Sequence, residues 1–362
     1  MKLRPIFVLL VCGAFGASSG CGEIDDGGAD GITKTESALV TFTAVPLVNG
    51  WVPSSFGTAV PASALVDGKV YLRGAMQSGT AGLAFTLPLG RRPSTNVYLP
   101  VNLVVATKGR LLIQTTGAVT VVAEGGTFSN AQSFTSLDGV SFAVNNAGYT
   151  NLALQNGWTA SPFSTRPPAV RNVNGVIHFQ GAMATTGSNA QPFVLPLGFA
   201  PSTNAYLPLD TFAGTKGRLF VNIGGQVSIV GENGVFTNAK QFTSLEGLSY
   251  PLNPAGDPSF MCFTPINGWV GMPFSTRMPC LKNFNGIVRL MGAVSTTGAN
   301  PVPLILPVGF RPTAQVYIEA DMFQGKQGRL IINTSGQIQV QGKVAFSDAS
   351  QFTSFEGAFF AQ

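Results

Sequence analysis

The chain has 362 residues, too many for one ordinary domain of about 100 to 200, and only 10% of them are charged, against about 25% in most soluble domains. Glycine and phenylalanine are frequent, which suits strands joined by tight turns and excludes a predominantly helical protein. The net charge of +5 includes Lys2 and Arg4, which we expect to be removed, so 19 of the 21 basic residues remain against 16 acidic ones. This weak, scattered excess gives no indication of a nucleic-acid partner.

Residues 1–20 have the pattern of an export signal. Lys2 and Arg4 give a positive start, an apolar run begins at Ile6–Val11, and small residues follow over Gly13–Gly20. The apolar run is too short to span a bilayer. We therefore expect the protein to leave the cytoplasm.

The signal ends at Ser18–Cys21, a Ser-Ser-Gly-Cys sequence that resembles the lipobox of bacterial lipoproteins. The resemblance implies cleavage before Cys21 and lipid attachment to that cysteine. Gly22 in the next position then implies the outer membrane or cell surface, with a periplasmic orientation left open. The alternative is an ordinary secretory cut after Gly16 or Ser19, which leaves Cys21 unlipidated.

Residues 21–42 predict a flexible tether between the lipid and the first folded unit. The segment is rich in glycine, lacks apolar periodicity and carries the acidic residues Glu23, Asp25, Asp26 and Asp30.

Three internal repeats follow the tether, over residues 43–144, 150–253 and 260–362. Asn-Gly-Trp, Leu-Pro-x-Gly, Gly-Arg-Leu and Phe-Thr-Ser recur in the same order at nearly constant spacing. The joins at Asn145–Gly148 and Asn253–Pro258 are short and rich in turn residues. We therefore expect three units in fixed succession, each able to fold alone.

Each repeat shows the alternation typical of strands. Leu219, Val221 and Ile223 share one face, and after the turn at Gly224–Gly225 the same alternation resumes, which predicts a hairpin. Further strands are predicted after Asp-Gly or Asn-Gly dipeptides, which favour tight hairpin turns. These strands are residues 69–72, 176–179 and 287–290. Seven to nine short strands per repeat predict an all-β fold of three antiparallel, jelly-roll-like β-sandwiches.

The order of these motifs resembles a β-sandwich module of the distal tail-fibre and receptor-binding proteins of tailed phages. The best match is Leu306–Pro312, Leu-Pro-Val-Gly-Phe-Arg-Pro; repeat 1 departs from it at Arg91 and repeat 2 at Ala200. The resemblance covers the three repeats and implies surface recognition, often of glycans.

Two cysteines remain in the repeats, Cys262 and Cys280, and an oxidising compartment favours a disulfide between them. Two free buried thiols are the alternative. The sequence has no Cys-x-x-Cys motif or Cys/His cluster, so we predict no metal site and no cofactor.

The sequence predicts no catalytic residues. His178 is the only histidine, and aligning the repeats places Leu72 and Arg289 at or near its position, which excludes repeated histidine catalysis. One acid recurs before a glycine, as Asp138, Glu246 and Glu356, and we expect its side chain to fix the backbone by hydrogen bonds. A second recurring acid is lacking, because Asn102 stands where the other repeats have Asp210 and Asp321.

Two recurring residue types are candidate ligand-binding groups. The recurring tryptophans are Trp51, Trp158 and Trp269. They could stack on sugar rings, although a structural role in the core is the better explanation of their recurrence. The recurring arginines are Arg110, Arg218 and Arg329. They could bind acidic groups of a ligand, although a place on a solvated strand edge is the better explanation of their recurrence. The polar loops at Thr185–Gly187 and Thr296–Gly298 could contact sugars or be plain turns.

These patterns favour an exported, lipid-anchored protein that recognises a polysaccharide or another surface ligand through repeated sites. The alternative is a structural envelope or spacer lipoprotein without a small ligand. Contact with the membrane is expected only through the N-terminal lipid.

Overall fold

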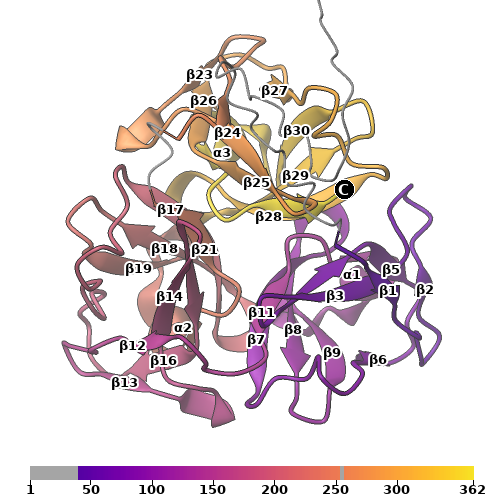
Figure 1. Cartoon of the computed structure of the whole chain (residues 1–362), viewed down its shortest axis with the longest axis vertical. Coiled ribbons are helices and arrows are strands. Elements are labelled where there is room, and N and C mark those ends of the chain that lie inside the picture. The colour runs from indigo at the N-terminus through magenta and orange to yellow at the C-terminus, as the bar shows by residue number, and fades with distance from the viewer. Residues whose placement is uncertain (1–39, 253–256) are drawn as a thin grey trace, which may run out of the picture. The chain divides into compact units, whose positions relative to one another are not determined.

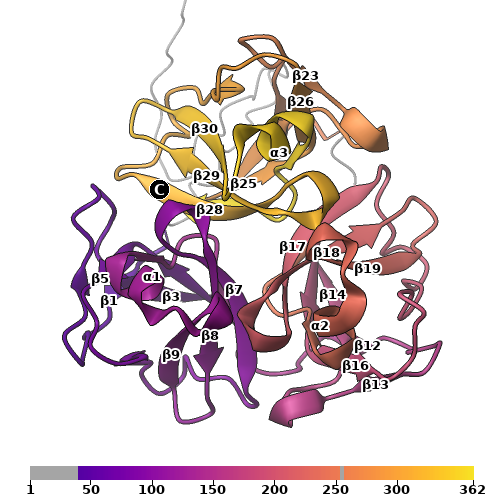
Figure 2. The ribbon, with the colours of Figure 1, turned by 180° about the vertical axis from the view of Figure 1, so that it is seen from behind.

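The computed structural model describes residues 40–252 and 257–362 (Figure 1). The export signal, Cys21 and nearly all of the tether lie outside the described residues. The all-β fold class is confirmed, and every pairing between named strands is antiparallel; Figure 2 shows the same ribbon from behind.

The elements of the three repeats follow one plan. Repeat 1 contains β1 (Thr43–Ala44), β2 (Val52–Pro53), β3 (Ala62–Val66), β4 (Lys69–Arg73), β5 (Ala75–Gln77), β6 (Leu83–Thr86), β7 (Val97–Asn102), β8 (Lys108–Ile113), β9 (Ala118–Ala123), α1 (Phe128–Ser133), β10 (Thr135–Ser136) and β11 (Ser141–Ala143). Repeat 2 contains β12 (Thr150–Asn151), β13 (Trp158–Ala160), β14 (Ala169–Val173), β15 (Val176–Gln180), β16 (Ala182–Thr185), β17 (Ala205–Thr211), β18 (Lys216–Val221), β19 (Val227–Gly231), α2 (Phe236–Gln241), β20 (Thr243–Ser244) and β21 (Ser249–Pro251).

Repeat 3 contains β22 (Met261–Cys262), β23 (Trp269–Gly271), β24 (Cys280–Phe284), β25 (Ile287–Met291), β26 (Ala293–Thr296), β27 (Leu304–Ile305), β28 (Val316–Asp321), β29 (Gln327–Ile332), β30 (Gln337–Gly342), α3 (Phe346–Gln351), β31 (Thr353–Ser354) and β32 (Phe359–Ala361). Short 3-10 turns connect the strands: η1 (Val104–Ala106), η2 (Glu124–Gly126), η3 (Pro162–Ser164), η4 (Phe212–Gly214), η5 (Glu232–Gly234), η6 (Pro273–Ser275) and η7 (Phe323–Gly325).

Each repeat places its core between sheets of its own. One four-stranded sheet has the order β1-β3-β4-β11 in repeat 1, and repeats 2 and 3 have the equivalents β12-β14-β15-β21 and β22-β24-β25-β32. The facing strands are β6-β9-β8-β7 in repeat 1 and β27-β30-β29-β28 in repeat 3, while in repeat 2 they belong to a six-stranded sheet. The three large apolar clusters each draw their residues from one repeat.

The predicted Asp-Gly and Asn-Gly turns are present between the third and fourth strands of each repeat. Both turn residues have positive φ, 50° and 76° for Asp67–Gly68, as a two-residue hairpin requires. In the predicted hairpin of repeat 2, Leu219 and Val221 are buried, but Ile223 is 68% exposed because it lies beyond the end of β18. The placement of Ile223 on the buried face was therefore wrong.

The repeats contact one another in a closed cycle. We call the contacts between them seam 1–2, seam 2–3 and seam 3–1. At each seam a serine hydroxyl donates to the backbone carbonyl oxygen of a tyrosine in the neighbouring repeat. The pairs are Ser244 with Tyr98 at 2.6 Å, Ser354 with Tyr206 at 2.7 Å and Ser136 with Tyr317 at 2.6 Å. Strands β7, β17 and β28 also contact one another pairwise (Figure 1).

This cycle corrects the expectation of units that merely follow one another along the chain. The described residues after the tether form one compact unit, and polar side chains of each repeat are buried against the next. Turn-rich joins are compatible with both arrangements, so their composition did not reveal the seams.

Cys262 and Cys280 form a disulfide, and they are direct cross-strand partners in β22 and β24. The equivalent pairs in the other repeats are Ala44 with Ala62 and Asn151 with Ala169. The disulfide therefore links the edge strand β22 to β24 in repeat 3, and the other two repeats have no equivalent bond.

Replacing both cysteines with alanine should lower the free energy of unfolding by about 3 kcal/mol, because the bond closes a loop with a sequence separation of 18 residues. Urea denaturation of the full chain measures this loss. Reductant should destabilise the wild type and leave the double variant unchanged. Equal stability of the two oxidised proteins would contradict the prediction.

Candidate functional site

Buried ion pairs occupy seams 1–2 and 2–3. At seam 1–2, Asp210 accepts from Lys108 at 2.8 Å and from Arg110 at 2.5 Å, and the Asp210 side chain is fully buried. At seam 2–3, Asp321 has the equivalent place, with Lys216 at 3.3 Å and Arg218 at 2.6 Å.

Seam 3–1 has neutral residues in the same positions. Asn102 replaces the aspartate and Gln327 replaces the lysine, while Arg329 remains and donates from Nη1 to Asn102 Oδ1 at 3.2 Å. Both members of the lysine–aspartate pair are therefore neutral together. Gln327 donates instead to Glu124 Oε2 of repeat 1 at 2.6 Å, so the two neutral residues have different partners at this seam.

The recurring arginines are consequently not on solvated edges, and that expectation was wrong. Each guanidinium lies 4.9 Å from the ring centre of a tyrosine in its own repeat. The pairs are Arg110 with Tyr98, Arg218 with Tyr206 and Arg329 with Tyr317. The alternation of β8, β18 and β29 turned these side chains away from their own core, and a neighbouring repeat covers that face.

The recurring tryptophans lie in the cores. Trp51, Trp158 and Trp269 are 3%, 5% and 3% exposed. Each indole N–H donates to a backbone carbonyl oxygen, and each ring meets a phenylalanine of the following short helix edge to face. With the ring faces covered, the core interpretation fits better than sugar stacking.

The recurring acids hold a glycine N–H, in agreement with the expected side-chain to backbone bond. Asp138 accepts from Gly74 at 2.9 Å, and the two equivalent glutamates do the same. Gly74 has φ 85°, which favours glycine, and a Cβ there would lie 2.3 Å from a carbonyl oxygen. Each glutamate also pairs with a buried arginine: Glu246 with Arg166 at 2.9 Å and Glu356 with Arg277 at 3.0 Å.

His178 belongs to a buried polar cluster shared by the repeats. Its Nδ1 accepts from Lys69 Nζ of repeat 1 at 2.7 Å. The strand registers place Tyr71, next to Leu72, and Arg289 at the equivalent positions. Burial, together with the neighbouring Lys69, lowers the pKa of His178 well below its usual value. This cluster is enclosed and offers no access to a large ligand.

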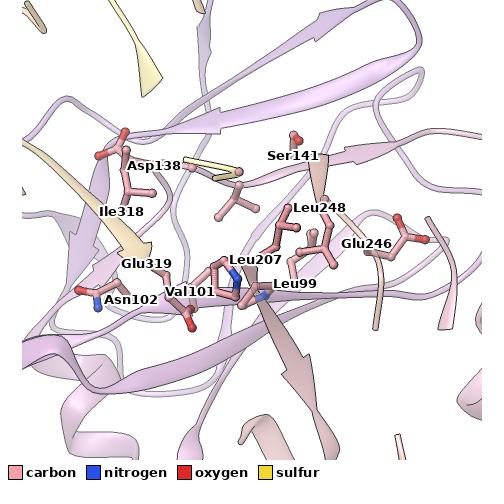
Figure 3. A pocket seen from close by; sticks show the side chains of 16 residues that line it. Leu99, Val101, Asn102, Asp138, Ser141, Leu207, Glu246, Leu248, Ile318 and Glu319 are labelled. Atoms are coloured by element: carbon pink, nitrogen blue, oxygen red, sulfur yellow. The ribbon is translucent and has the colours of Figure 1, made fainter. Parts of the chain in front are cut away.

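A small cavity of about 40 Å³ lies where the three repeats meet (Figure 3). Glu319 lines it at the position that Pro100 and Pro208 hold in the other repeats. Burial raises the pKa of Glu319 to about 7. Because one water needs roughly 10 to 15 Å³, the space holds only a few waters and is too small for a sugar.

Two equivalent surface grooves are larger than this cavity. The repeat-2 groove, of about 330 Å³, lies among β13, β16, α2 and the turns η3 and η4. Its lining is Gly157, Thr159, Phe163, Ala184, Thr185, Thr186, Phe212, Lys240 and Gln241. The repeat-3 groove has the same volume and the lining Gly268, Val270, Ser295, Thr296, Thr297, Ser350 and Gln351.

An exposed phenylalanine lines the repeat-2 groove. Phe163 lines the repeat-2 groove and is 53% exposed, and its equivalent Phe274, in η6 next to β23, is 54% exposed. Phe274 lines a separate apolar pocket of about 140 Å³ at seam 2–3 and is not part of the lining of the repeat-3 groove. An aromatic ring and a polar loop therefore line one groove together in repeat 2.

The backbone of these phenylalanines is strained. Phe163 has φ 56° and its neighbours Ser161 and Ser164 are also left-handed; Phe274 has φ 54° in the same arrangement. Bulky residues rarely adopt positive φ. The central residues of other 3-10 turns, such as Val105 in η1 and Ala213 in η4, have it as well, so the conformation belongs to this type of turn. Phe242 at 5.5 Å and Phe212 at 6.1 Å from Phe163, between ring centres, help to hold that ring in place.

In the equivalent region of repeat 1, polar side chains form hydrogen bonds with other groups of the same repeat. Gln77 Oε1 accepts from the backbone and hydroxyl of Ser55, and Gln132 Nε2 donates to the carbonyl oxygen of Gly79. Phe56 is 48% exposed there. Repeat 1 therefore presents a phenylalanine whose neighbouring polar side chains are already engaged.

Sequence reasoning noticed the threonine loops and missed the phenylalanines. The signal available was Pro-Phe-Ser-Thr-Arg, which occurs at Pro162–Arg166 and at Pro273–Arg277. Nothing in it shows that a phenylalanine has positive φ and an exposed ring.

No family model, curated protein or solved structure matches this chain. Over residues 40–252 and 257–362 there is no helix long and apolar enough to cross a membrane and no metal-binding cluster of His, Cys, Asp or Glu.

Proposed function

We propose that this protein is a glycan-recognition protein that uses the repeat-2 and repeat-3 grooves as binding sites. The observation that carries the proposal is the repetition of one groove, about 330 Å³ in both repeats, with the exposed Phe163 in the lining of the repeat-2 groove and its equivalent Phe274 in a separate pocket at seam 2–3. A volume of this size falls at the lower end for small-molecule sites.

The chemistry of the grooves suits a sugar. One face of a pyranose is rich in C–H groups and can pack on Phe163 or Phe274. The side-chain amide of Gln241 donates within its own helix to Thr237, which leaves its oxygen to accept from a ligand hydroxyl, and Gln351 bonds in the same way to Ser347.

Two sites on one compact unit favour a repetitive ligand. Their separation is fixed by the seams, so a polymer that reaches both binds the second at high effective concentration. As part of this proposal, export and a lipid on Cys21 hold the unit at the outer membrane or cell surface. The structural spacer remains the alternative if no glycan binds.

Replacing Phe163 and Phe274 with asparagine should abolish or sharply reduce retardation in affinity electrophoresis through the polysaccharides that slow the wild type. Loss of aromatic packing should weaken each groove about 2- to 10-fold, and loss of both removes the linked effect as well. Asparagine tolerates positive φ, so the fold should be kept.

Phe56→Asn is the matched control, because it removes an equally exposed phenylalanine outside the two grooves. Its migration should equal that of the wild type. Unretarded wild type across a broad panel of neutral and acidic polysaccharides, or equal retardation of the double variant, would refute the proposal.

A further inference from the structure

The two grooves differ in charge at one equivalent position. Lys240 is the fifth residue of α2 and lines the repeat-2 groove, while Ser350 is the fifth residue of α3 and lines the repeat-3 groove. The next residue, Gln241 or Gln351, lines the groove in both repeats. The two helices thus contribute equivalent residues to the two grooves, with a cationic side chain in repeat 2 and a neutral one in repeat 3.

Lys240 is the one lysine in the described ranges whose side chain has no protein partner. The other six engage a carboxylate or, for Lys69, a histidine. The lining of the repeat-2 groove contains no carboxylate that could neutralise the ammonium group. The cation is half-buried and faces a concavity that also contains hydroxyl groups and aromatic rings.

We infer that the repeat-2 groove selects a glycan unit carrying a carboxylate or another anionic group, which pairs with Lys240, whereas the repeat-3 groove takes a neutral unit. This inference rests on the proposed function and names the ligand class of the same sites. An anion on the ligand satisfies the one lysine that the protein leaves unpaired. The serine in the repeat-3 groove can bond a neutral hydroxyl and offers no charge.

The test compares polygalacturonate with its fully methyl-esterified form, which shares the same sugar ring without the charge. Affinity electrophoresis of the full chain is run at low and high salt. We expect wild type to prefer polygalacturonate at low salt and Lys240→Ser to reduce that preference about 2- to 5-fold, with a flatter salt dependence. Ser350→Lys should raise the preference.

Lys282→Ser is the matched control, because it removes the same charge from repeat 3 outside both grooves. Lys282 pairs with Asp257 on the surface at 2.9 Å. An unchanged preference in Lys240→Ser, or an equal loss in Lys282→Ser, would overturn the inference.

The two failures are distinguishable. If only the ligand class is wrong, both polymers retard the wild type equally and Phe163→Asn weakens both. If the proposed function is wrong, neither these two polymers nor the broader polysaccharide panel retards any of the proteins.

Discussion

Replacing Asp210 with asparagine is expected to lower the free energy of unfolding by about 3 to 5 kcal/mol. The change leaves Lys108 and Arg110 inside seam 1–2 without their counter-charge, and their side chains are only 1% and 11% exposed. Burying an unpaired cation costs far more than losing a surface ion pair. Urea denaturation of the full chain at neutral pH measures the loss.

The natural seam 3–1 supplies the control. Adding Lys108→Gln to Asp210→Asn recreates the Gln327 and Asn102 arrangement and should recover at least half of the lost stability, with a large coupling energy in the double-mutant cycle. If Asp210→Asn is as stable as the wild type, or if the second change gives no recovery, the buried ion pair does not support the seam.

Asp138→Asn is expected to stabilise the protein at pH 8 and to leave it unchanged near pH 4. Burial raises the pKa of Asp138 to about 7 from an ordinary value of 3.8, and repeat 1 has Ala59 at the position of Arg166 and Arg277. An acid whose folded pKa is raised contributes stability fully below its unfolded pKa and loses it as pH rises toward the folded one. The window is therefore pH 4 to 7, and the full effect is on the order of 4 kcal/mol.

Asparagine retains the acceptor for the Gly74 N–H, so the difference between variant and wild type isolates the charge of Asp138. The contrast is Glu246→Gln in repeat 2, which should destabilise the protein at pH 8 because Arg166 then lacks its partner. Urea denaturation from pH 4 to 8 measures both. Parallel stability profiles of the wild type and Asp138→Asn would show that Asp138 does not titrate in this window.

The repeats, the tight turns and the all-β class could be predicted because they depend on local chemistry. Asp67–Gly68 accepts positive φ in any context, and alternation predicts that Leu219 and Val221 share a buried face. Alternation does not say what covers the opposite face. A polar residue on the face opposite the core suits both contact with water and contact with a neighbouring repeat. For this reason Arg110 was expected at a solvated edge.

Both departures at seam 3–1 are visible in the sequence: Asn102 stands against Asp210 and Asp321, and Gln327 against Lys108 and Lys216. Their common place is not visible, because the two residues lie more than two hundred positions apart. Only the fold brings both into one cycle of contacts. The exposed phenylalanines could not be predicted either, since no residue preference indicates a positive φ at Phe163.

We propose that two grooves on one unit bind a repetitive glycan together. The decisive measurement compares, for the intact protein, the affinity for a retarding polysaccharide with that for a short oligosaccharide of the same repeat. We expect the polymer to bind about 10² to 10⁴ times more tightly, and Phe274→Asn to reduce its affinity to nearly that of the oligosaccharide. Equal affinity for polymer and oligosaccharide per repeating unit, unchanged by Phe274→Asn, would contradict it.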